Sequence, residues 1–478
     1  METVIDYGIW SLAPLIFAIV TAFVTRSAIF SLFAGCLIGV LMVGFDPSKS
    51  LLGIDPAGGF VKLIAESLDG EFIRICVIIM FIGILFELFK RAGVLVAFAN
   101  MVSKTGSTSP KKVKFTTWLL GFFIVDDYFS PLMTGPIMRP LTDAAKISRE
   151  KLAFILDSTT ASVCVLVPFM SWGAYIGGLI VAQGGPVAGS DDAIALFAAS
   201  IPYNIYPMLL ILFTLLICLE IIPDFGFMKK AETRARIEGK VLRDGAIPMV
   251  SEDDDDDIFE QTQENPNLIF DFLVPIIIVF GTVIVSYFVF GSLKISEAFV
   301  TAVIYLGISL YVKGYVKDFS DLTELGVKGA KSVMSAIIIT ALAYCINTIT
   351  KGLGAAEFIM MASEGFMTPA LLVASTFFIT ATISFSTGTS WGAFALMIPF
   401  VLPVAYGFSG GVAHDPIVYK ALAAVVGGGI FGDHSSPVSD TSVLSSIGAG
   451  SDHMDHVITQ LPYALLIGSV TIVIYLVI

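Results

Sequence analysis

Charged residues are scarce in this chain of 478 residues. Asp, Glu, Lys and Arg make up only 14% of it, against about 25% in an average soluble protein, and the mean hydropathy is +0.88. Even a large soluble core leaves most charges on its surface, so this composition excludes a soluble protein of this length. Apolar runs of roughly 20 residues, long enough to cross a bilayer, recur from end to end. The sequence therefore predicts an all-α, multi-pass membrane protein.

Several other patterns are missing. The apolar runs are continuous, as at 76–89 and 209–222, and do not alternate with the period of two that β-barrel strands require. The five cysteines lie in apolar stretches without Cys-x-x-Cys spacing, and the four histidines form no His-Glu-x-x-His motif. We therefore predict neither a resident metal nor a cofactor. No basic patch suits nucleic acid. Segment 1–7 has two acids and no base, so we expect no cleavable signal peptide.

The apolar runs and the basic residues predict a topology in the cell's inner membrane. We expect about ten transmembrane helices, which begin near Gly8, Ser27, Phe72, Lys151, Ala193, Leu268, Ser296, Ser332, Lys420 and Val457. Basic residues cluster at 90–114, 139–151, 229–243 and 313–331. The positive-inside rule places these four segments in the cytoplasm. The acidic run 252–257 follows the third segment and is interpreted as part of a solvated loop.

Two polar segments predict re-entrant hairpins. The first, 114–140, has basic residues on both flanks, so a single crossing would put one flank on the wrong side. Its interior contains Asp126, Asp127 and several prolines and glycines, which are tolerated at membrane depth only inside protein or beside water. The second, 369–408, carries the polar sequence Thr-Gly-Thr-Ser at its middle. We expect it to enter from the opposite face.

The order of these features predicts inverted-topology repeats. Residues 87–98 match 347–358 at one constant offset, and a helix interrupted near a proline follows each hairpin, over 151–183 and 417–450. Inverted repeats with broken helices are typical of secondary transporters. The predicted organisation is an N-terminal half, a cytoplasmic linker and a C-terminal half, at 1–223, 224–267 and 268–478.

Polar groups at the predicted breaks and hairpins indicate a cation site. A broken helix leaves free N–H groups at one half-helix start and free carbonyls at the other half-helix end. Carboxylates and hydroxyls complete an oxygen shell, and this mixture suits sodium. The predicted ion- or substrate-binding residues are Asp126, Asp127, Ser130, Arg139, Asp157, Ser158, Thr159, Thr387, Gly388, Thr389, Ser390, Asp433, His434, Ser436, Asp440 and Thr441.

The acids carry most of this interpretation, because an ionisable group inside the membrane is costly and is a functional candidate by default. The adjacent Asp126 and Asp127 repel each other, which suits a site that exchanges protons for sodium. For Asp157 and Asp440 the alternative is an acid that is solvated or paired near the end of a span.

Two basic candidates also have competing interpretations. His434 either titrates or orients the helix break through hydrogen bonds. Arg139 either clamps a substrate carboxylate or fixes topology by pairing with Asp143, and the pairing is the favoured interpretation. Glu87 is interpreted as an ion pair with Lys90 and Arg91 at the membrane interface.

A second pair of histidines lies at the predicted start of the last span. Asp452, His453, Asp455 and His456 have metal-ligand residue types at helical spacing, but they follow a glycine-rich cytoplasmic turn. We interpret them as a hydrated interface. The competing hypothesis from another class is an intramembrane metal-dependent hydrolase, in which His453 and His456 would act with Asp433 and His434. It is disfavoured because only four histidines exist.

Several motifs point to a known family. Residues 432–441, Gly-Asp-His-Ser-Ser-Pro-Val-Ser-Asp-Thr, closely resemble the signature of the NhaC-type sodium/proton antiporter family, and 387–392 resemble its second-hairpin motif. Segments of the first half resemble a subgroup of the same family, at 126–128, 138–143, 146–152 and 157–159. This resemblance implies the ion-transporter fold, with scaffold helices around a mobile domain that holds the hairpins and broken helices. It also implies an elevator-like movement.

The resemblance leaves the cargo open. Some members of the family resemble malate/lactate or amino-acid exchangers. This chain departs from the subgroup's pattern at 129–131 and 161–162, where cargo is expected to bind. We predict a secondary active transporter, not an enzyme, that exchanges sodium for protons by alternating access. The alternative is a sodium- or proton-coupled transporter of a small organic anion or amino acid. The expected partners of the protein are the lipid bilayer, sodium and protons, and a homodimer is one option for its assembly. A channel is disfavoured because the hairpins would occlude its pore.

Overall fold

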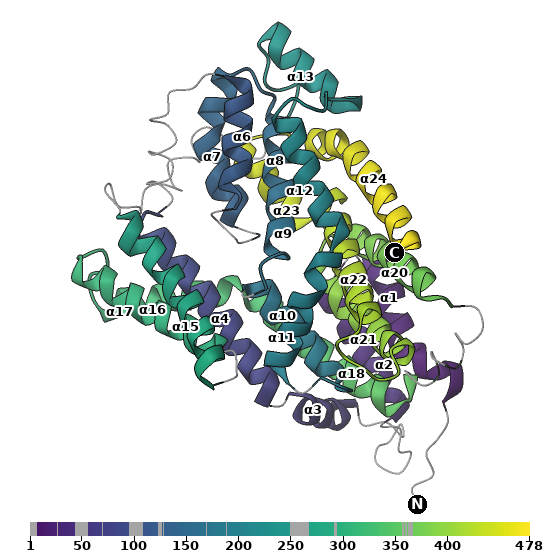
Figure 1. Ribbon diagram of the computed structural model, residues 1–478. Helices are drawn as coiled ribbons and strands as arrows, with labels where there is room; N and C mark the ends of the chain where they lie inside the picture. The colour runs from purple at the N-terminus through teal and green to yellow at the C-terminus, as the bar shows by residue number, and fades with distance from the viewer. Residues whose placement is uncertain are drawn as a thin grey trace, which may run out of the picture.

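The computed structural model describes most of the chain, with a few gaps. The described residues are 7–25, 27–43, 56–68, 70–94, 109–122, 127, 129–168, 170–187, 189–248, 267–290, 294–355, 358, 361 and 367–478. Within these ranges the protein is helical throughout, apart from one isolated β-bridge between Pro248 and Asp452 (Figure 1). Asp126 and the acidic run 252–257 lie outside the described residues.

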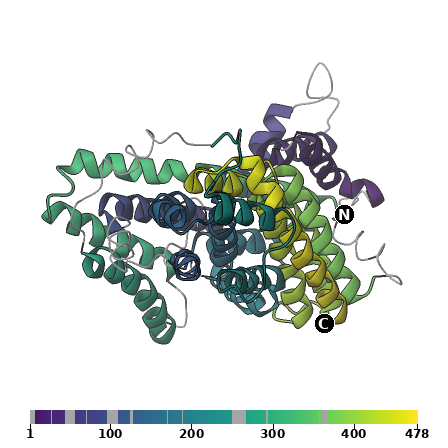
Figure 2. The same ribbon diagram turned by 90° about the horizontal axis from the view of Figure 1, so that it is seen from above.

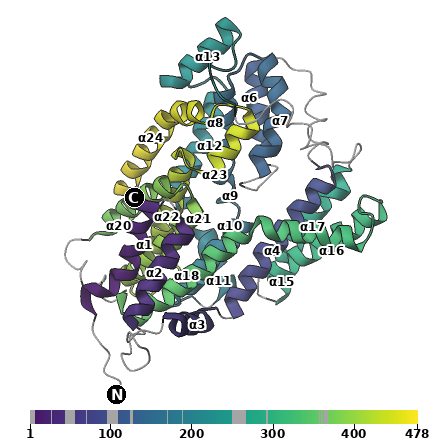
Figure 3. The same ribbon diagram turned by 180° about the vertical axis from the view of Figure 1, so that it is seen from behind.

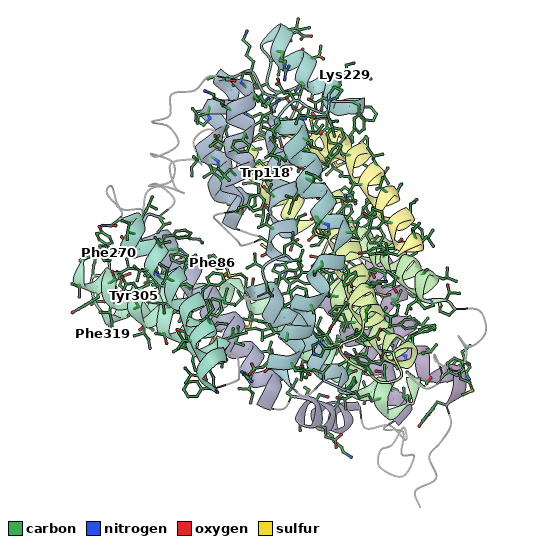
Figure 4. The ribbon with its side chains drawn as sticks, in the orientation of Figure 1. Phe86, Trp118, Lys229, Phe270, Tyr305 and Phe319 are labelled. Atoms are coloured by element: carbon green, nitrogen blue, oxygen red, sulfur yellow. The ribbon has the colours of Figure 1, made fainter. Side chains whose placement is uncertain are left out.

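One group of helices forms an arm at the left of Figure 1. It consists of α4 (Gly70–Arg91), α15 (Val274–Phe290), α16 (Ile295–Val312) and α17 (Phe319–Ser332), with a π-helical turn η4 (Ile269–Leu273) leading into α15. Phe270 and Phe319 are exposed at its outer end (Figure 4), as helices facing lipid tails require. Glu87 forms ion pairs with Lys90 and Lys328 at 2.9 and 3.0 Å, so the predicted ion pair at this position includes a lysine of α17.

A second group contains the N-terminal helices. After the short η1 (Gly8–Leu12), α1 (Ala13–Thr25) packs on α2 (Ala28–Val43), and α2 packs on α18 (Met334–Gly352). The view from behind shows α1 and α2 against α18 and the helices of the C-terminal half (Figure 3). The short α3 (Pro56–Ser67) contacts the ends of α2 and α18. Seen from above, the arm and the N-terminal helices lie at opposite sides of the molecule (Figure 2).

The hairpins and interrupted helices lie between these groups. The first hairpin is α6 (Pro110–Leu120) and α7 (Phe129–Ala144), and the first interrupted helix is α8 (Arg149–Thr159), α9 (Ala161–Cys164) and α10 (Ser171–Gln183). The second hairpin is α20 (Pro369–Thr387) and α21 (Ser390–Phe408), and the second interrupted helix is α22 (Pro416–Ser435) and α23 (Asp440–Ala449). The first helix is interrupted at Thr160 and at 165–170, and the second at 436–439.

The remaining helices flank this centre. They are α11 (Ser190–Ser200), the turn η2 (Ile201–Tyr203), α12 (Ile205–Cys218), α13 (Gly226–Glu238) and α24 (His453–Val477). Trp118 of α6 donates its indole N–H to the carbonyl of Ile211 in α12, at 3.2 Å. The helix α13, which carries Lys229, lies at the top of Figures 1 and 4 and packs on α8 and α24.

The helices are long enough to confirm a multi-pass membrane protein. Seven of the described helices are long and apolar enough to cross a bilayer, and the number reaches nine if two bent helix pairs each count as one span. A helix or the start of one lies at each of the ten predicted span starts. The total of about ten spans remains a prediction, because several helices are shorter than a bilayer requires and α20 and α21 are each long enough to cross it.

The closest helix packing in the centre depends on a small residue. The helices α20 and α22 lie against each other along much of their length. A Cβ atom at Gly428 would come within 2.5 Å of the Phe377 carbonyl oxygen, so only glycine permits this approach. Small residues at helix crossings stabilise membrane proteins by van der Waals packing, since lipid tails supply no hydrophobic drive between helices.

We therefore expect the substitution Gly428→Ala to destabilise the protein by about 1–3 kcal/mol, as overpacking typically does. The matched control is Gly281→Ala in α15, where an added Cβ meets no atom within 4 Å. Thermal unfolding of the purified protein in detergent would measure both. Equal unfolding temperatures for the two variants would contradict this account of the packing.

Candidate ion-binding site

The two hairpins and the two interrupted helices meet at one place. Asp127, in the turn of the first hairpin, accepts a hydrogen bond of 3.0 Å from the indole N–H of Trp391, at the turn of the second. The Trp391 ring also packs on Trp172, just beyond the first interruption, with ring centroids 4.9 Å apart. Residues from three segments widely separated in sequence thus meet at one centre.

The turn of the second hairpin lies directly on the second interruption. Gly388 has φ +70°, in the left-handed region, and its carbonyl accepts a 3.4 Å hydrogen bond from the N–H of Asp440. A Cβ at this position would come within 2.3 Å of the Val438 carbonyl oxygen. Glycine is therefore required twice over, for the backbone conformation and for the close approach.

The carboxylate of Asp433 lies at the centre of this arrangement. It is 1% exposed, and three hydroxyl groups donate hydrogen bonds to it. They belong to Ser390 at 2.7 Å, Ser439 at 2.6 Å and Thr441 at 3.1 Å. A backbone N–H, that of Ser390, also acts on this carboxylate, and no basic side chain is among the hydrogen-bond partners that the described residues supply. A buried carboxylate without a basic partner is costly to keep ionised, which makes Asp433 the central residue of the candidate site.

The two half-helices add their ends to this site. Asp433 belongs to the last turn of α22, whose carbonyls carry the negative end of the helix dipole. Four residues separate the end of α22 from the first residue of α23. Ser439 caps the N-terminus of α23 by accepting a 3.2 Å hydrogen bond from the N–H of Ser442. Ser436, at the end of α22, donates its hydroxyl to the carbonyl of Phe385 at 2.6 Å. This contact holds the interruption against the second hairpin.

A second buried carboxylate lies on the other side of α23. Asp157 of α8 is 2% exposed and accepts hydrogen bonds from Ser442 at 2.8 Å and from the Gln460 amide at 2.9 Å. The interpretation of Asp157 as a solvated acid at the end of a span is therefore wrong. Asp440 is half-buried at the first position of α23 and accepts from the N–H of Thr441 at 2.9 Å.

His434 faces away from the Asp433 carboxylate. Its ring nitrogens lie 3.1 Å from the Ser158 hydroxyl and 3.3 Å from the Tyr206 hydroxyl, and its carbonyl accepts from Gln460 at 2.5 Å. These contacts tie α22 to α8, α12 and α24. They match the interpretation in which His434 orients the break.

The predicted hydroxyls fall into two sets. Ser390, Ser436 and Thr441 reach across to other elements, as described above. Thr159 and Thr387 instead donate to carbonyls of their own helices, Ile155 at 2.7 Å and Ile383 at 3.0 Å. Ser130 is buried at the start of α7, and Thr389 precedes the first residue of α21.

Arg139 lies at the far end of α23. Its guanidinium donates to the carbonyls of Ile447 and Gly448, at 3.2 and 2.9 Å, which lie in the last turn of that helix. The expected pair between Arg139 and Asp143 does not form. Asp143 instead accepts two hydrogen bonds from Arg149, at 2.7 and 2.6 Å, because Arg149 stands six residues later across the turn between α7 and α8.

Several contributors were not predicted from the sequence. Ser439 and Ser442 lie within or next to the motif 432–441 and could have been found there, because an interrupted helix needs a cap at its second start. Gln460 and Tyr206 lie on distant helices and carry no local signal. Their contribution follows from tertiary packing alone.

Comparison with known proteins agrees with this arrangement. A model of the Na+/H+ antiporter family matches residues 163–478. The chain is 30% identical to an uncharacterized protein of Haemophilus influenzae over 99% of this chain and 92% of that protein. It is 31% identical to the malate-2H(+)/Na(+)-lactate antiporter of Bacillus subtilis over 39% of this chain and 38% of that one.

A solved structure shares the fold. The YdaH transporter of Alcanivorax borkumensis superposes with a TM-score of 0.53 and 14% sequence identity, over 88% of each chain. The family match covers the second hairpin, both parts of the second interrupted helix and the Asp433 site. The chain is thus a transporter rather than an enzyme, and it belongs to the Na+/H+ antiporter family.

Proposed function

We propose that the protein is a sodium/proton antiporter of the inner membrane, and that Asp433 is where the two cations compete. The observation that carries this proposal is a buried carboxylate surrounded by hydroxyl groups at the gap between two half-helices. Such a carboxylate needs a positive partner to remain ionised in a low-dielectric interior. A sodium ion meets that need, whereas a proton removes it by making the carboxyl group neutral, and one cation excludes the other.

The surrounding groups can serve both states. When sodium is bound, the hydroxyls of Ser390, Ser439 and Thr441 direct their oxygen lone pairs toward the ion, and the end of α22 adds carbonyl oxygens. When a proton is bound, the carboxyl group is neutral and the same hydroxyls hydrogen-bond to it. Hydroxyls suit this exchange because each can donate or accept.

We further propose that the two halves are inverted repeats and that the site is reached alternately from the two sides of the membrane. Both halves contain a long helix, a hairpin and an interrupted helix in the same order. The turns of the two hairpins touch each other through Asp127 and Trp391, as expected for hairpins that enter from opposite faces. In this proposal each turn would cover one approach to Asp433, which an alternating mechanism requires. A homodimeric assembly would provide a scaffold for an elevator-like movement.

A second candidate function is exchange of a small organic acid. The similarity to a malate-2H(+)/Na(+)-lactate antiporter favours it. In that case sodium would still bind at Asp433, and an organic anion would bind at the N–H groups of a half-helix start. In the described structure the Arg139 guanidinium is engaged by helix carbonyls, so it does not carry this candidate.

The first prediction concerns Asp433. Asp433→Asn keeps the side-chain shape but removes the charge that binds either cation, so sodium-driven proton movement in proteoliposomes should fall to the level of empty liposomes. A pH-sensitive dye inside the vesicles measures it. Asp244→Asn is the matched control, since Asp244 is exposed and pairs with Lys240.

In the wild type, competition at one carboxylate also requires that the KM for sodium rises as the pH falls. Wild-type proton movement in Asp433→Asn, or a KM for sodium that does not depend on pH, would remove Asp433 from the exchange site.

The second prediction concerns the hydroxyl ligands. Thr441→Val preserves shape but removes one oxygen from the cage, so the KM for sodium should rise roughly tenfold, the effect of about 1.5 kcal/mol lost at a charged group. Thr471→Val is the control, because Thr471 is equally buried on α24 and bonds only within its own helix. Equal KM values for both variants would show that Thr441 is not a ligand.

The third prediction separates the two candidate functions. Under plain antiport, proteoliposomes should exchange sodium for protons without added organic solute, and labelled malate, lactate or arginine should not accumulate. The second candidate would replace the first if one of these solutes were taken up in a sodium-dependent way and sodium drove no pH change when that solute was left out.

A further inference from the structure

The end of the molecule that the positive-inside rule assigns to the cytoplasm separates its polar groups into buried and exposed ones. His456, near the start of α24, is fully buried, and its Nδ1 lies 2.9 Å from the Ser446 hydroxyl. The interpretation of His456 as part of a hydrated interface is therefore wrong. Lys111 and Lys112, in the first turn of α6, are exposed at the same end.

Many basic side chains of this end are paired with acids. Glu220 joins α6 to α13, because it accepts hydrogen bonds from Lys114 and from Arg236, each at 3.0 Å. The other paired bases are Arg149, Lys151, Arg234, Lys240 and Arg243, whose partners are Asp143, Asp224, Glu150, Asp244 and Asp455. The acids of this end are therefore largely neutralised by these bases.

Five exposed lysines at the same end remain outside these pairs. They are Lys111 and Lys112 of α6, Lys146 in the turn between α7 and α8, and Lys229 and Lys230 of α13. Within the described ranges of the chain, no acid lies within ion-pair distance of them. Lys111 and Lys112 do not stabilise α6 itself. Positive charges at a helix start oppose the helix dipole, and the first turn of α6 contains no acid to offset them.

An apolar face of α6 continues below these two lysines. Phe115 and Leu119 follow Lys111 at intervals of four residues, so the three side chains share one side of the helix. Phe115, Leu119 and Phe122, which lies in the turn after α6, are each more than one third exposed. Trp118 packs against the rings of Phe115 and Phe122, with centroids 6.0 and 4.6 Å apart (Figure 4). A helix with lysines above exposed aromatic and aliphatic side chains suits the boundary between lipid headgroups and tails.

We propose that this face of α6 is a docking site for an anionic phospholipid of the cytoplasmic leaflet. The phosphate group lies between the ammonium groups of Lys111 and Lys112, and the acyl chains lie along Phe115, Leu119 and Phe122. The methylene stems of the lysines reach over the apolar surface while their charged ends stay at headgroup level. The site thus accounts for both the unpaired charge and the exposed apolar face.

Two arguments favour this occupant over others. A zwitterionic headgroup carries its own positive charge, which two adjacent lysines repel, whereas an anionic headgroup leaves only attraction. A soluble anion has no acyl chains to cover the apolar face. Lys146, Lys229 and Lys230 add positive charge at the same end. Each lysine at a membrane surface attracts anionic lipid by about 1 kcal/mol, which is about a fivefold preference.

Trp118 provides a reporter for this site. The protein is placed in phosphatidylcholine vesicles that contain a small fraction of phosphatidylglycerol with brominated acyl chains, which quench the fluorescence of an indole that they contact. Every protein carries Trp10→Phe, because Trp10 is also exposed. Brominated phosphatidylglycerol should quench more strongly than the same fraction of brominated phosphatidylcholine. Added salt should reduce the difference, since it screens exposed charges.

Variants of the two lysines test the cause of this preference. With Lys111→Gln and Lys112→Gln together, the preference for phosphatidylglycerol should fall about fivefold for each charge removed. Lys111→Arg with Lys112→Arg should keep it, because both charges remain. The matched control is Lys62→Gln, at an exposed lysine of α3 that pairs with Glu66, and it should leave the quenching unchanged.

Several outcomes would overturn the docking site. Equal quenching by the two brominated lipids in the wild type is one, and an unchanged preference in the double Gln variant is another. Absence of quenching by either lipid would show that this face of α6 does not meet lipid. A preference that appears only after the acids of 252–257 are replaced with Asn and Gln would make that segment the occupant instead. No transport is measured, so these outcomes do not depend on the proposed sodium/proton exchange.

Discussion

The structure depends on the cost of holding a charge inside the membrane. Asp433 cannot be solvated by water where it lies, and the hydroxyls of Ser390, Ser439 and Thr441 only partly replace that solvation. The interruption of the helix follows from this cost, since a continuous helix would offer the carboxylate no free backbone groups. In the proposed exchange the remaining charge is neutralised by a mobile cation. The arrangement that destabilises the empty site would then be the same one that makes it bind.

This constraint explains the tight packing around the site. Free backbone groups at membrane depth are tolerated only when protein surrounds them. Gly388 lets the turn of the second hairpin come into backbone contact with the interruption, and Gly428 lets α20 approach α22 equally closely. Trp172 and Trp391 close the space from the side of the first interruption. The dense centre is therefore a requirement of the broken helices and not an independent feature of the fold.

Sequence patterns predict what is local and miss what is tertiary. Apolar runs, prolines and clustered hydroxyls indicated the helices, the polar turns and the segments where the helices are interrupted, because each of these signals lies within one stretch of chain. The partner of Arg149 and the burial of His456 could not be predicted in the same way. They depend on which helix packs beside α7 and α24. The sequence does not show whether a charged side chain is solvated by water or hydrogen-bonded to a carbonyl group. Gln460 lacks any motif yet joins α24 to both Asp157 and the end of α22.

The short helix α23 unites these parts electrostatically. Its N-terminus faces the carboxylates of Asp433 and Asp157, and its last carbonyls accept hydrogen bonds from Arg139 and Arg149. Acids at the start and bases at the end both stabilise the helix dipole. The arginines are therefore linked to the acids through α23. In the exchange that we propose, a cation that neutralises Asp433 would weaken the stabilisation of the N-terminal end while that of the C-terminal end persists. Occupancy of the proposed site would then change how firmly α23 is held against the two hairpins, which is the coupling that an alternating transporter needs.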